Sequence, residues 1–365
     1  MSGDNRILGL LHKAVSEGIF PGSVLLVSHS KKIIFFEAVG NSSLVPTVRP
    51  MTRQIRFDLA SLTKPLATTL STLCLVSQGM VGLDDSLAKL LPSTSVPEDK
   101  KKITLRQLLS HCSGLPAWKP YYLSLAALPQ MTRKSQIRRQ ILAEPLAYPP
   151  ATNTAYSDLG FMLIEWIIEE STGVDLYHFT REKLFDHLGC DAPGFIPLGE
   201  KSGFDHNQFA DTEYCPWRGR IISGEVHDEN AYALGGVAGH AGLFGTAQEV
   251  KCVLDCILDT ISGENTPVPW SRKQLTEFLQ PARLHTSSTW ALGFDTPASS
   301  DSSAGHYFST NSVGHLGFTG TSFWLDLKKK IAVILLSNRV HPSRDNEKIK
   351  EFRPLLHDAV MEEFG

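Results

Sequence analysis

The sequence predicts an α/β protein of the α+β type, in which an antiparallel sheet built from both chain ends is flanked by helices and joined to a mostly helical second lobe. Short apolar runs typical of strands occur near the start and again near the end of the 365 residues, whereas the middle shows helical periodicity. Strands from the two ends can bury their apolar faces in one shared sheet. We therefore assign residues 1–60 and 226–365 to the sheet lobe and residues 61–225 to the helical lobe of a single unit, with a ligand cleft between the lobes.

The first sixty residues are expected to form one helix and one hairpin. Apolar residues at helical spacing predict a helix over 7–17. Two strands follow over 23–29 and 33–39, around a Ser-Lys-Lys turn. Residues 49–56 are polar and read as a loop that leads to Ser61.

The rest of the chain continues with helices and then returns to strands. Helices are expected over 61–78, 84–91, 104–110, 132–143 and 157–170, and after an irregular stretch at 190–225 also over 247–261 and 271–280. Strands are expected over 290–294, 323–327 and 331–337, followed by a closing helix over 344–364.

Composition and charge exclude several classes of protein. With 42% hydrophobic residues, 20% charged residues and a net charge of −3, the chain is an ordinary globular one without the basic surface that binds nucleic acid. No apolar run approaches the roughly 20 residues that span a membrane, and the start of the chain lacks an apolar leader, so we expect a cytoplasmic location. The scattered cysteines are then expected to be reduced core residues. They are Cys74, Cys112, Cys190, Cys215, Cys252 and Cys256.

Ser61 and Lys64, in the stretch D-L-A-S-L-T-K-P at 58–65, are the first candidates for catalysis. A serine hydroxyl is a weak nucleophile near neutral pH and needs a proton acceptor or a cation beside it. Residues three apart share one face of a helix, so the Lys64 amine can reach the Ser61 hydroxyl. Pro65 fits the first turn of a helix that begins near Ser61, because its missing N–H has no helical partner there. Taken alone, the spacing also fits a helix start with a solvated lysine.

Two later stretches add a phenol, a carboxylate and an imidazole. Tyr156 and Asp158 precede an apolar helix, and Tyr156 could act as a general base if a cation stabilises its phenolate. The alternative is that Tyr156 is a core aromatic residue and Asp158 a helix cap. Glycines flank His315 within 314–321, and exposed N–H groups there could form half of an oxyanion hole. The alternative for this stretch is a glycine-rich turn with a solvated histidine.

The order and spacing of these motifs resemble the serine β-lactamase and penicillin-binding-protein superfamily, in particular its class C-like branch of esterases, D-aminopeptidases and D,D-carboxypeptidases. The first motif of that family is S-L-T-K at 61–64, the second, Y-x-N, is Y-S-D at 156–158, and the third, K-T-G, is H-L-G at 315–317. The stretches L-L-S-H-C-S-G-L at 108–115 and G-G-V-A-G-H-A-G-L-F at 235–244 are also similar to that branch. The resemblance covers about residues 7 to 360 and implies the fold expected above.

The resemblance also implies a mechanism. Ser61 is acylated by an ester, amide or lactam carbonyl, and water then hydrolyses the acyl-enzyme. Lys64 and Tyr156 would share the proton of Ser61, and which of them is the resting base stays open because coupled groups titrate together. The backbone N–H groups of Ser61 and Phe318 would hold the oxyanion. Four residues would contact the substrate: Asp158, His315, Gly317 and Phe318. The partner is a small ester, amide or peptide, and no metal or other cofactor is implied.

Two departures from the family pattern favour esters or small amides over β-lactams. Asp158 replaces asparagine, so it cannot donate a hydrogen bond when ionised, and its charge favours the ammonium form of Lys64. That shifts the role of base towards Tyr156. His315 replaces lysine and is mostly uncharged at neutral pH, so it would hold a substrate carboxylate less firmly.

Other interpretations stay open at this point. The activity could be that of a D,D-carboxypeptidase or a class C-like β-lactamase, or the chain could be a covalent sensor or binding module that acylates but turns over slowly. His227, Asp228 and His240 could ligate a metal, but their spacing matches no metal motif, and we expect them to brace loops at the cleft rim. An aromatic cluster of Trp118, Tyr121 and Tyr122 could line the acyl pocket or pack between lobes.

Overall fold

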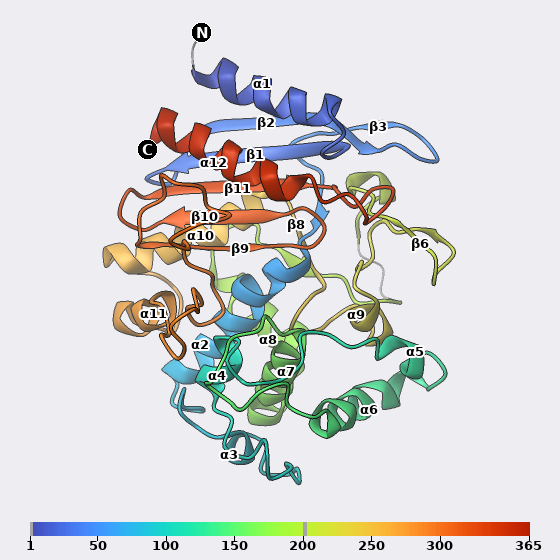
Figure 1. Ribbon diagram of the computed structural model, residues 1–365, viewed down its shortest axis with the longest axis vertical. Coiled ribbons are helices and arrows are strands. Elements are labelled where there is room, and N and C mark those ends of the chain that lie inside the picture. Colours follow the sequence, from blue (N-terminus) through green and yellow to red (C-terminus); the bar gives the residue numbers. More distant parts are fainter. Residues whose placement is uncertain (1–2, 200–202) are drawn as a thin grey trace.

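A six-stranded antiparallel sheet, with strands from both ends of the chain, forms the centre of the upper half of the protein (Figure 1). The structure is a computed structural model that describes residues 3–199 and 203–365. The strand order is β3-β2-β1-β11-β10-β9. The strands are β1 (Gly22–His29), β2 (Lys32–Ser43), β3 (Arg49–Pro50), β9 (Ser312–Leu316), β10 (Ser322–Asp326) and β11 (Ile331–Ser337). Strand β1 pairs directly with β11, which confirms the predicted sheet from both chain ends.

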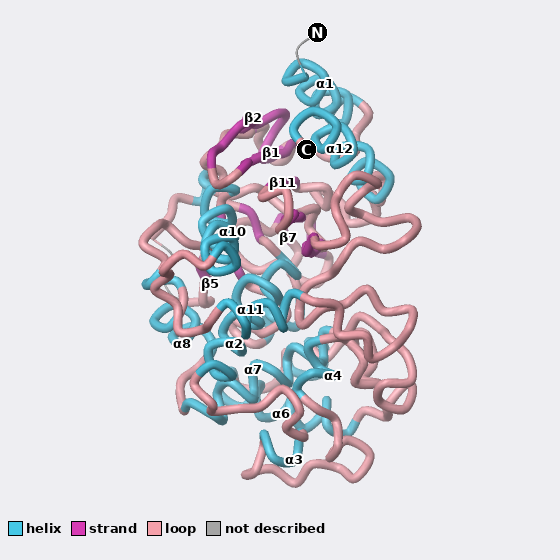
Figure 2. The backbone as a smooth tube through the Cα atoms, turned by 90° about the vertical axis from the view of Figure 1, so that its left-hand side faces the viewer, coloured by secondary structure: helices cyan, strands magenta, loops and turns pink. Residues whose placement is uncertain are grey.

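Helices cover both faces of this sheet. Successive residues of a strand point to opposite faces, so Leu25 packs with α1 (Gly3–Ser16) and α12 (Ile349–Phe364), whereas Leu26 packs with α10 (Ala247–Ser262). Figure 2 shows α1 and α12 on one side of the strands and α10 on the other. This cover on both faces explains why β11 is buried throughout and why its sequence does not alternate between polar and apolar residues.

A second lobe, mostly helical, lies below the sheet (Figure 1). Its helices are α2 (Leu70–Ser77), α3 (Leu87–Leu90), α4 (Leu105–Leu109), α5 (Tyr122–Leu125), α6 (Gln130–Ala143), α7 (Asp158–Thr172) and α8 (Leu176–Lys183). The central helix α7 is buried along most of its length, begins with Ser157 as a side-chain cap and ends at Gly173, whose φ is +71°. The α+β fold class is therefore confirmed, while the lobe boundaries stay a prediction.

Short elements join the two lobes. They are α9 (Glu229–Ala233), α11 (Arg272–Leu279), β4 (Phe57–Asp58), β5 (Gly194–Phe195), β6 (Tyr214–Cys215), β7 (Arg220–Ile221) and β8 (Leu243–Gly245). In the described residues, 190–225 are largely irregular, as predicted, and residues 200–202 of that stretch lie outside the described part. No helix among the described residues is long and apolar enough to cross a membrane.

Several element predictions were wrong. Residues 290–294 form no strand, because Trp290 turns inward and packs on the rings of Tyr156 and His315. Conversely, no strand was predicted at β9, where Gly314 is required because a side chain at that position would collide with Trp324. The closing helix begins at Ile349, not at 344, and α3 is shorter than predicted.

The expectation that all six cysteines are reduced also differs from the structure. Cys190 and Cys252 form a disulfide that fastens the loop after α8 to α10, across 62 positions of sequence. This pair could not be predicted from the sequence, because the two residues meet only through tertiary folding. Cys74, Cys112 and Cys215 are free and buried, and Cys256 is free and half-buried.

Candidate active site

Ser61 lies in a short 3-10 turn, η1 (Ala60–Leu62), which runs into a π-helical segment, η2 (Lys64–Thr69), and then into α2. The residue before it, Ala60, has a φ of +48°, a conformation that residues with side chains rarely adopt. Asp58 stabilises this turn, because its Oδ1 accepts a hydrogen bond of 2.8 Å from the Ala60 N–H. The helix predicted from Ser61 onward is present, but its first two turns are not regular α-helix.

Lys64 is completely buried, and its ammonium group donates two hydrogen bonds and forms one ion pair. Its Nζ lies 3.0 Å from Ser61 Oγ, 3.0 Å from the backbone oxygen of His240 and 2.7 Å from Asp158 Oδ1. An ammonium group has three N–H bonds, so these contacts satisfy it fully. The predicted approach of Lys64 to Ser61 is therefore present, and Asp158 is its counter-charge.

The charges around Lys64 favour a protonated lysine and a neutral tyrosine at rest. Burial acts to lower the pKa of Lys64, but the Asp158 carboxylate and Tyr156 outweigh it and raise that pKa. Burial raises the pKa of Tyr156, and the neighbouring Lys64 only partly offsets this. At neutral pH the pair therefore holds both of its protons, and its basic form is a minority species.

Tyr156 projects from the residues just before α7 into a group of aromatic rings. Its ring centroid lies 4.6 Å from that of His111, 5.5 Å from Trp290 and 5.9 Å from His315. Its hydroxyl is buried and forms no hydrogen bond of good geometry, although Lys64 and Ser61 lie close enough to influence its pKa. The phenol is thus held rigidly while its oxygen stays free for proton exchange.

The turn at 317–321 is attached directly to the chain just before Ser61. The hydroxyl of Thr319 donates to the Asp58 carbonyl at 2.8 Å, and that of Thr321 donates to the Leu59 carbonyl at 3.0 Å. Gly317 is required here, because a Cβ would lie 2.0 Å from Thr321 Oγ1. Within the described part of the chain, neither the Ser61 N–H nor the Phe318 N–H donates to another backbone group. The Ser61 and Phe318 amides, which belong to the wall of the same cavity, are therefore available as donors for an oxyanion hole.

His315 lies in β9 at the edge of the sheet and is an uncharged residue. Its Nδ1 donates to the Leu316 carbonyl at 2.8 Å, which leaves Nε2 as a buried acceptor without a partner. Burial, together with the charge of Lys64, lowers the pKa of His315 to about 3. It can accept a hydrogen bond from a substrate but cannot pair with a substrate anion at neutral pH.

These residues line one cavity of about 640 Å³. Six of the seven predicted site residues contribute to its wall: Ser61, Tyr156, Asp158, His315, Gly317 and Phe318. Lys64 contacts Ser61 and Asp158 from beneath it. Of the aromatic cluster, Trp118 lines the cavity, whereas Tyr121 packs in the core and Tyr122 packs against Trp217.

Sequence reasoning missed the part that His240 plays. This residue is buried, its carbonyl accepts from Lys64, and its Nε2 lies 2.9 Å from Asp228 Oδ1. Ligand atoms of Asp158, Asp228 and His240 lie within 4.8 Å of one another, a spacing that could hold a metal ion. Lys64 and His240 already pair with the two carboxylates, so the charge balance does not call for one. The one feature of the sequence that could have pointed to His240 was the similarity of the stretch at 235–244 to the class C-like branch.

Replacing Asp158 with asparagine should move the rising limb of the pH profile to lower pH. The carboxylate raises the pKa of both Lys64 and Tyr156, so its removal lowers both, whichever of the two is the base. A larger fraction of the pair is then basic at any given pH. The measurement is kcat/KM against pH for the wild type and Asp158→Asn. Asp345→Asn is the control, because it removes an exposed carboxylate that pairs with Ser343. If the rising limb of the Asp158→Asn profile stayed where it is in the wild type, the Lys64–Tyr156 pair would not be the base whose pKa Asp158 raises.

Comparisons with known proteins agree with this geometry. The sequence model of the family described as Beta-lactamase matches residues 9–357. The chain is 32% identical to the N-acetylmuramyl-L-alanine amidase of Bacillus subtilis (strain 168), over 91% of this chain and 80% of the relative.

Solved structures share the fold. The hydrolase EstCE1, described as having promiscuous acyltransferase activity, superposes with a TM-score of 0.74 and 22% identity, over 98% of both chains. Simvastatin synthase (LovD) from Aspergillus terreus has a TM-score of 0.74 and 18% identity, over 100% of this chain and 99% of that one. The match of the family model to nearly the whole length, together with the Bacillus relative, shows that the chain belongs to the β-lactamase family and is a serine hydrolase.

Proposed function

We propose that this enzyme hydrolyses carboxylic esters or small amides, of D-amino-acid or peptidoglycan type, through an acyl-enzyme on Ser61. The observation that carries the proposal is the 3.0 Å contact between Lys64 Nζ and Ser61 Oγ, in a cavity that also holds Tyr156 and two free backbone amides. The name of the Bacillus relative, an amidase for N-acetylmuramyl-L-alanine, supports the peptidoglycan type of amide.

In this mechanism Ser61 Oγ attacks the substrate carbonyl carbon while its proton passes to the Lys64–Tyr156 pair. The carbonyl oxygen becomes an oxyanion that accepts hydrogen bonds from the Ser61 and Phe318 N–H groups. The pair then gives a proton to the leaving oxygen or nitrogen, and the acyl group stays on Ser61. Water then attacks the acyl carbon and gives a proton to the pair. Ser61 Oγ leaves and takes a proton back from the pair, which releases the acid and the free enzyme.

The groups around the carbonyl support esters and small amides over β-lactams. The ionised Asp158, paired with Lys64, has only acceptor oxygens, so it cannot donate a hydrogen bond to a substrate carbonyl as the NH2 group of an asparagine would. His315 is buried and uncharged, so it lacks the charge of the lysine that the family pattern has there. A D,D-carboxypeptidase or class C-like β-lactamase is the alternative activity. A slowly deacylating sensor is a second alternative.

A substrate panel tests the proposal. We expect p-nitrophenyl butyrate to be hydrolysed with a higher kcat/KM than a chromogenic cephalosporin. A fluorophosphonate should label the protein once, with the adduct mapped to Ser61 by mass spectrometry of peptides. The reverse order of substrates would establish the β-lactamase alternative. A burst of one product equivalent followed by a persistent acyl adduct would establish the sensor.

A cytoplasmic location stays a proposal. The disulfide between Cys190 and Cys252 counts against it, since disulfides are rare in the reducing cytosol. No helix of the described residues could anchor the protein across a membrane in either case.

A further inference from the structure

Asp58 is a buried carboxylate that lies three residues before Ser61. It belongs to β4, it is 3% exposed, and among the described residues it forms no salt bridge with a lysine or an arginine. Its Oδ1 accepts the Ala60 N–H at 2.8 Å, and its Oδ2 accepts the His227 N–H at 2.6 Å. Burial raises the pKa of this carboxyl group, because the charged form is costly to bury. A carboxylate kept at such a cost, with both oxygens bonded to the backbone, indicates a specific role.

The first contact of Asp58 fixes the turn of the chain just before the nucleophile. Ala60 has a φ of +48°, a left-handed conformation that costs free energy for a residue with a side chain. Its N–H donates to Asp58 Oδ1, two residues earlier, and such local contacts stabilise turns. The conformation of Ala60 sets the direction in which the N–H of Ser61 points. One oxygen of Asp58 therefore helps to aim the first amide of the oxyanion hole.

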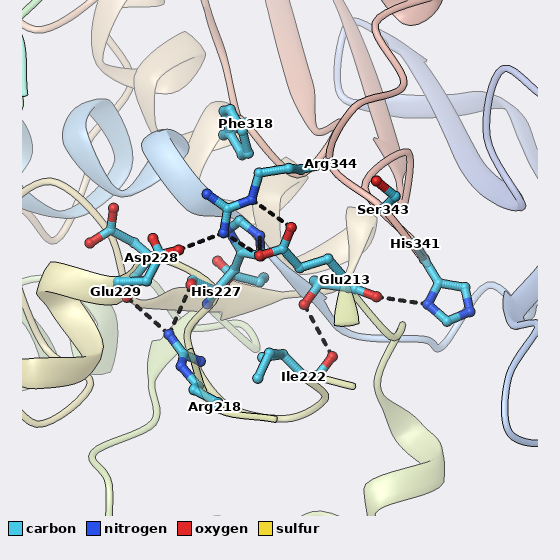
Figure 3. Close-up of polar contacts among 12 residues, drawn as sticks. Glu213, Arg218, Ile222, His227, Asp228, Glu229, Phe318, His341, Ser343 and Arg344 are labelled. Carbon is cyan, nitrogen blue, oxygen red and sulfur yellow. Dashed lines mark hydrogen bonds and ion pairs between the residues drawn. The ribbon is translucent and has the colours of Figure 1, made fainter. Parts of the chain in front are cut away.

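The second contact of Asp58 fixes a loop whose side chain packs on Phe318. The rings of His227 and Phe318 are stacked, with their centroids 5.5 Å apart and an angle of 28° between their planes. The ring of His227 is held as well, because its Nε2 lies 3.3 Å from Glu213 Oε1. Arg344 pairs with the same carboxylate, as Figure 3 shows. His227 is therefore anchored through both its backbone and its ring, and it supports the residue that carries the second amide.

The main chain of Asp58 is attached to the same turn. Its carbonyl accepts the hydroxyl of Thr319, the residue after Phe318, at 2.8 Å. Two buried arginines also bind this turn: Arg339 Nε donates to the Phe318 carbonyl at 2.9 Å, and Arg353 Nη2 donates to the last carbonyl of the turn at 3.1 Å. These contacts use a hydroxyl and carbonyls of the turn, and none of them uses the Phe318 N–H. Asp58 is thus connected to both segments that carry the amides.

We propose that Asp58 is a positioning residue that keeps the Ser61 and Phe318 amides aimed at one point, where the oxyanion forms. It does so through its contacts with Ala60 and His227. This inference rests on the proposed hydrolase function. Asp58 is not among the described residues that form the cavity wall, so it acts on the reaction only through these contacts. Donors that are aimed before the reaction stabilise the transition state more than the bound substrate, so loss of the aim should lower kcat and leave KM almost unchanged.

Asp58→Asn removes one of the two acceptors and preserves the shape of the side chain. An asparagine has a single acceptor oxygen, and its NH2 group would face a backbone N–H, which is also a donor. Either Ala60 or His227 then loses its contact, and one amide of the hole loses its support. With p-nitrophenyl butyrate we expect kcat to fall by about tenfold or more and KM to change by less than about twofold, since removal of a whole oxyanion-hole donor costs about 10²–10³ in kcat.

A thiono ester reports whether this loss lies in the oxyanion hole. O-(4-nitrophenyl) thionobutyrate differs from p-nitrophenyl butyrate only in having C=S in place of C=O, and sulfur is a weaker hydrogen-bond acceptor. The wild type should prefer the oxygen ester, and this preference in kcat/KM should fall by about tenfold in Asp58→Asn. An unchanged preference would overturn the inference and leave the hydrolase standing. A wild type that hydrolyses neither ester would overturn the proposed function, and this inference with it.

Asp326→Asn is the matched control, because Asp326 is also a completely buried carboxylate that accepts backbone N–H groups. Its partners are the N–H groups of Ser309 at 2.9 Å and Lys329 at 2.8 Å, and it lies at the end of β10 remote from the turn at 317–321. This variant should lose stability in urea, as Asp58→Asn does, but keep the wild-type preference for the oxygen ester. A loss of folded enzyme lowers both rates alike and cancels in the preference. An equal loss of preference in the two variants would overturn the inference.

Two further variants separate the contacts of Asp58. Asp58→Asn/Ala60→Gly should regain part of the lost preference, because glycine adopts a positive φ without the help of Asp58. Asp58→Ser offers one hydroxyl, which can still accept the Ala60 N–H, so its preference should lie between those of the wild type and Asp58→Asn. A double variant with no more preference than Asp58→Asn would overturn the part assigned to Ala60.

Binding of butylboronic acid tests the hole without turnover. The Ser61 oxygen forms a bond to boron while its proton passes to the Lys64–Tyr156 pair, and the tetrahedral anion places an oxygen where the oxyanion would lie. By isothermal titration calorimetry, the Kd should rise by about tenfold in Asp58→Asn and stay unchanged in Asp326→Asn. Equal affinity of the wild type and Asp58→Asn would overturn the inference, whether or not any ester is hydrolysed.

Discussion

Ser61→Ala should abolish turnover of every substrate while leaving the fold intact. The substitution removes the oxygen that would be acylated, and the loss of such a nucleophile lowers kcat by at least about a thousandfold. The Ser61 side chain makes one hydrogen bond, with Lys64, and caps no helix, so the free energy of unfolding should change by no more than about 1 kcal/mol. The measurements are kcat/KM with p-nitrophenyl butyrate and unfolding in urea.

Ser77→Ala provides the comparison for this variant. Ser77 lies at the far end of α2, where its hydroxyl binds the Cys74 carbonyl of the same helix, away from the cavity. Its variant should keep the activity of the wild type. If Ser61→Ala kept more than about a tenth of the wild-type rate, the nucleophile would have to be sought elsewhere.

Lys64→Met should cost both activity and stability. The ammonium donates to Ser61 and His240 and pairs with Asp158, and methionine can do none of these. Asp158 would be left as a largely buried carboxylate without a counter-charge, which typically costs about 3–5 kcal/mol. The rate should fall at least about a hundredfold, because no cation remains beside the serine oxygen or the Tyr156 phenol.

A double variant separates the two losses. In Lys64→Met/Asp158→Asn the orphaned charge is gone, so most of the lost free energy of unfolding should return, whereas activity should not. Urea unfolding of the wild type, both single variants and the double variant measures the coupling between the two side chains. A double variant as unstable as Lys64→Met alone would show that the ion pair is not the source of the loss.

The sequence was sufficient for the parts of the site that depend on local spacing. Ser61 and Lys64 are three residues apart, and the approach of the lysine follows from that spacing once the helix forms. The sheet from both chain ends was also predictable, because β1 and β11 are too apolar to be exposed. Asp158 could be identified as the partner of Lys64 only through the order of the three motifs.

Contacts that depend on tertiary folding could not be predicted. Arg339 and Arg353 look like ordinary surface residues in the sequence, and their burial depends on how α12 packs against one face of the sheet. His240 reaches Lys64 through its backbone oxygen, an atom that every residue has and that leaves no mark in the sequence. The strand β9 was not predicted, because the indole of Trp324, ten residues after Gly314, is what requires a glycine there.

The threonine contacts beneath the reaction centre join parts of the chain that are made at very different times. Thr319 and Thr321 bind carbonyls 261 and 262 positions earlier in the sequence. A polypeptide that has left the ribosome only as far as its helical middle holds the serine and its lysine, but it lacks the turn at 317–321 and with it the Phe318 amide. We therefore expect hydrolysis to begin only after the final strands have been synthesised and folded against the first, so that unfinished chains are inactive.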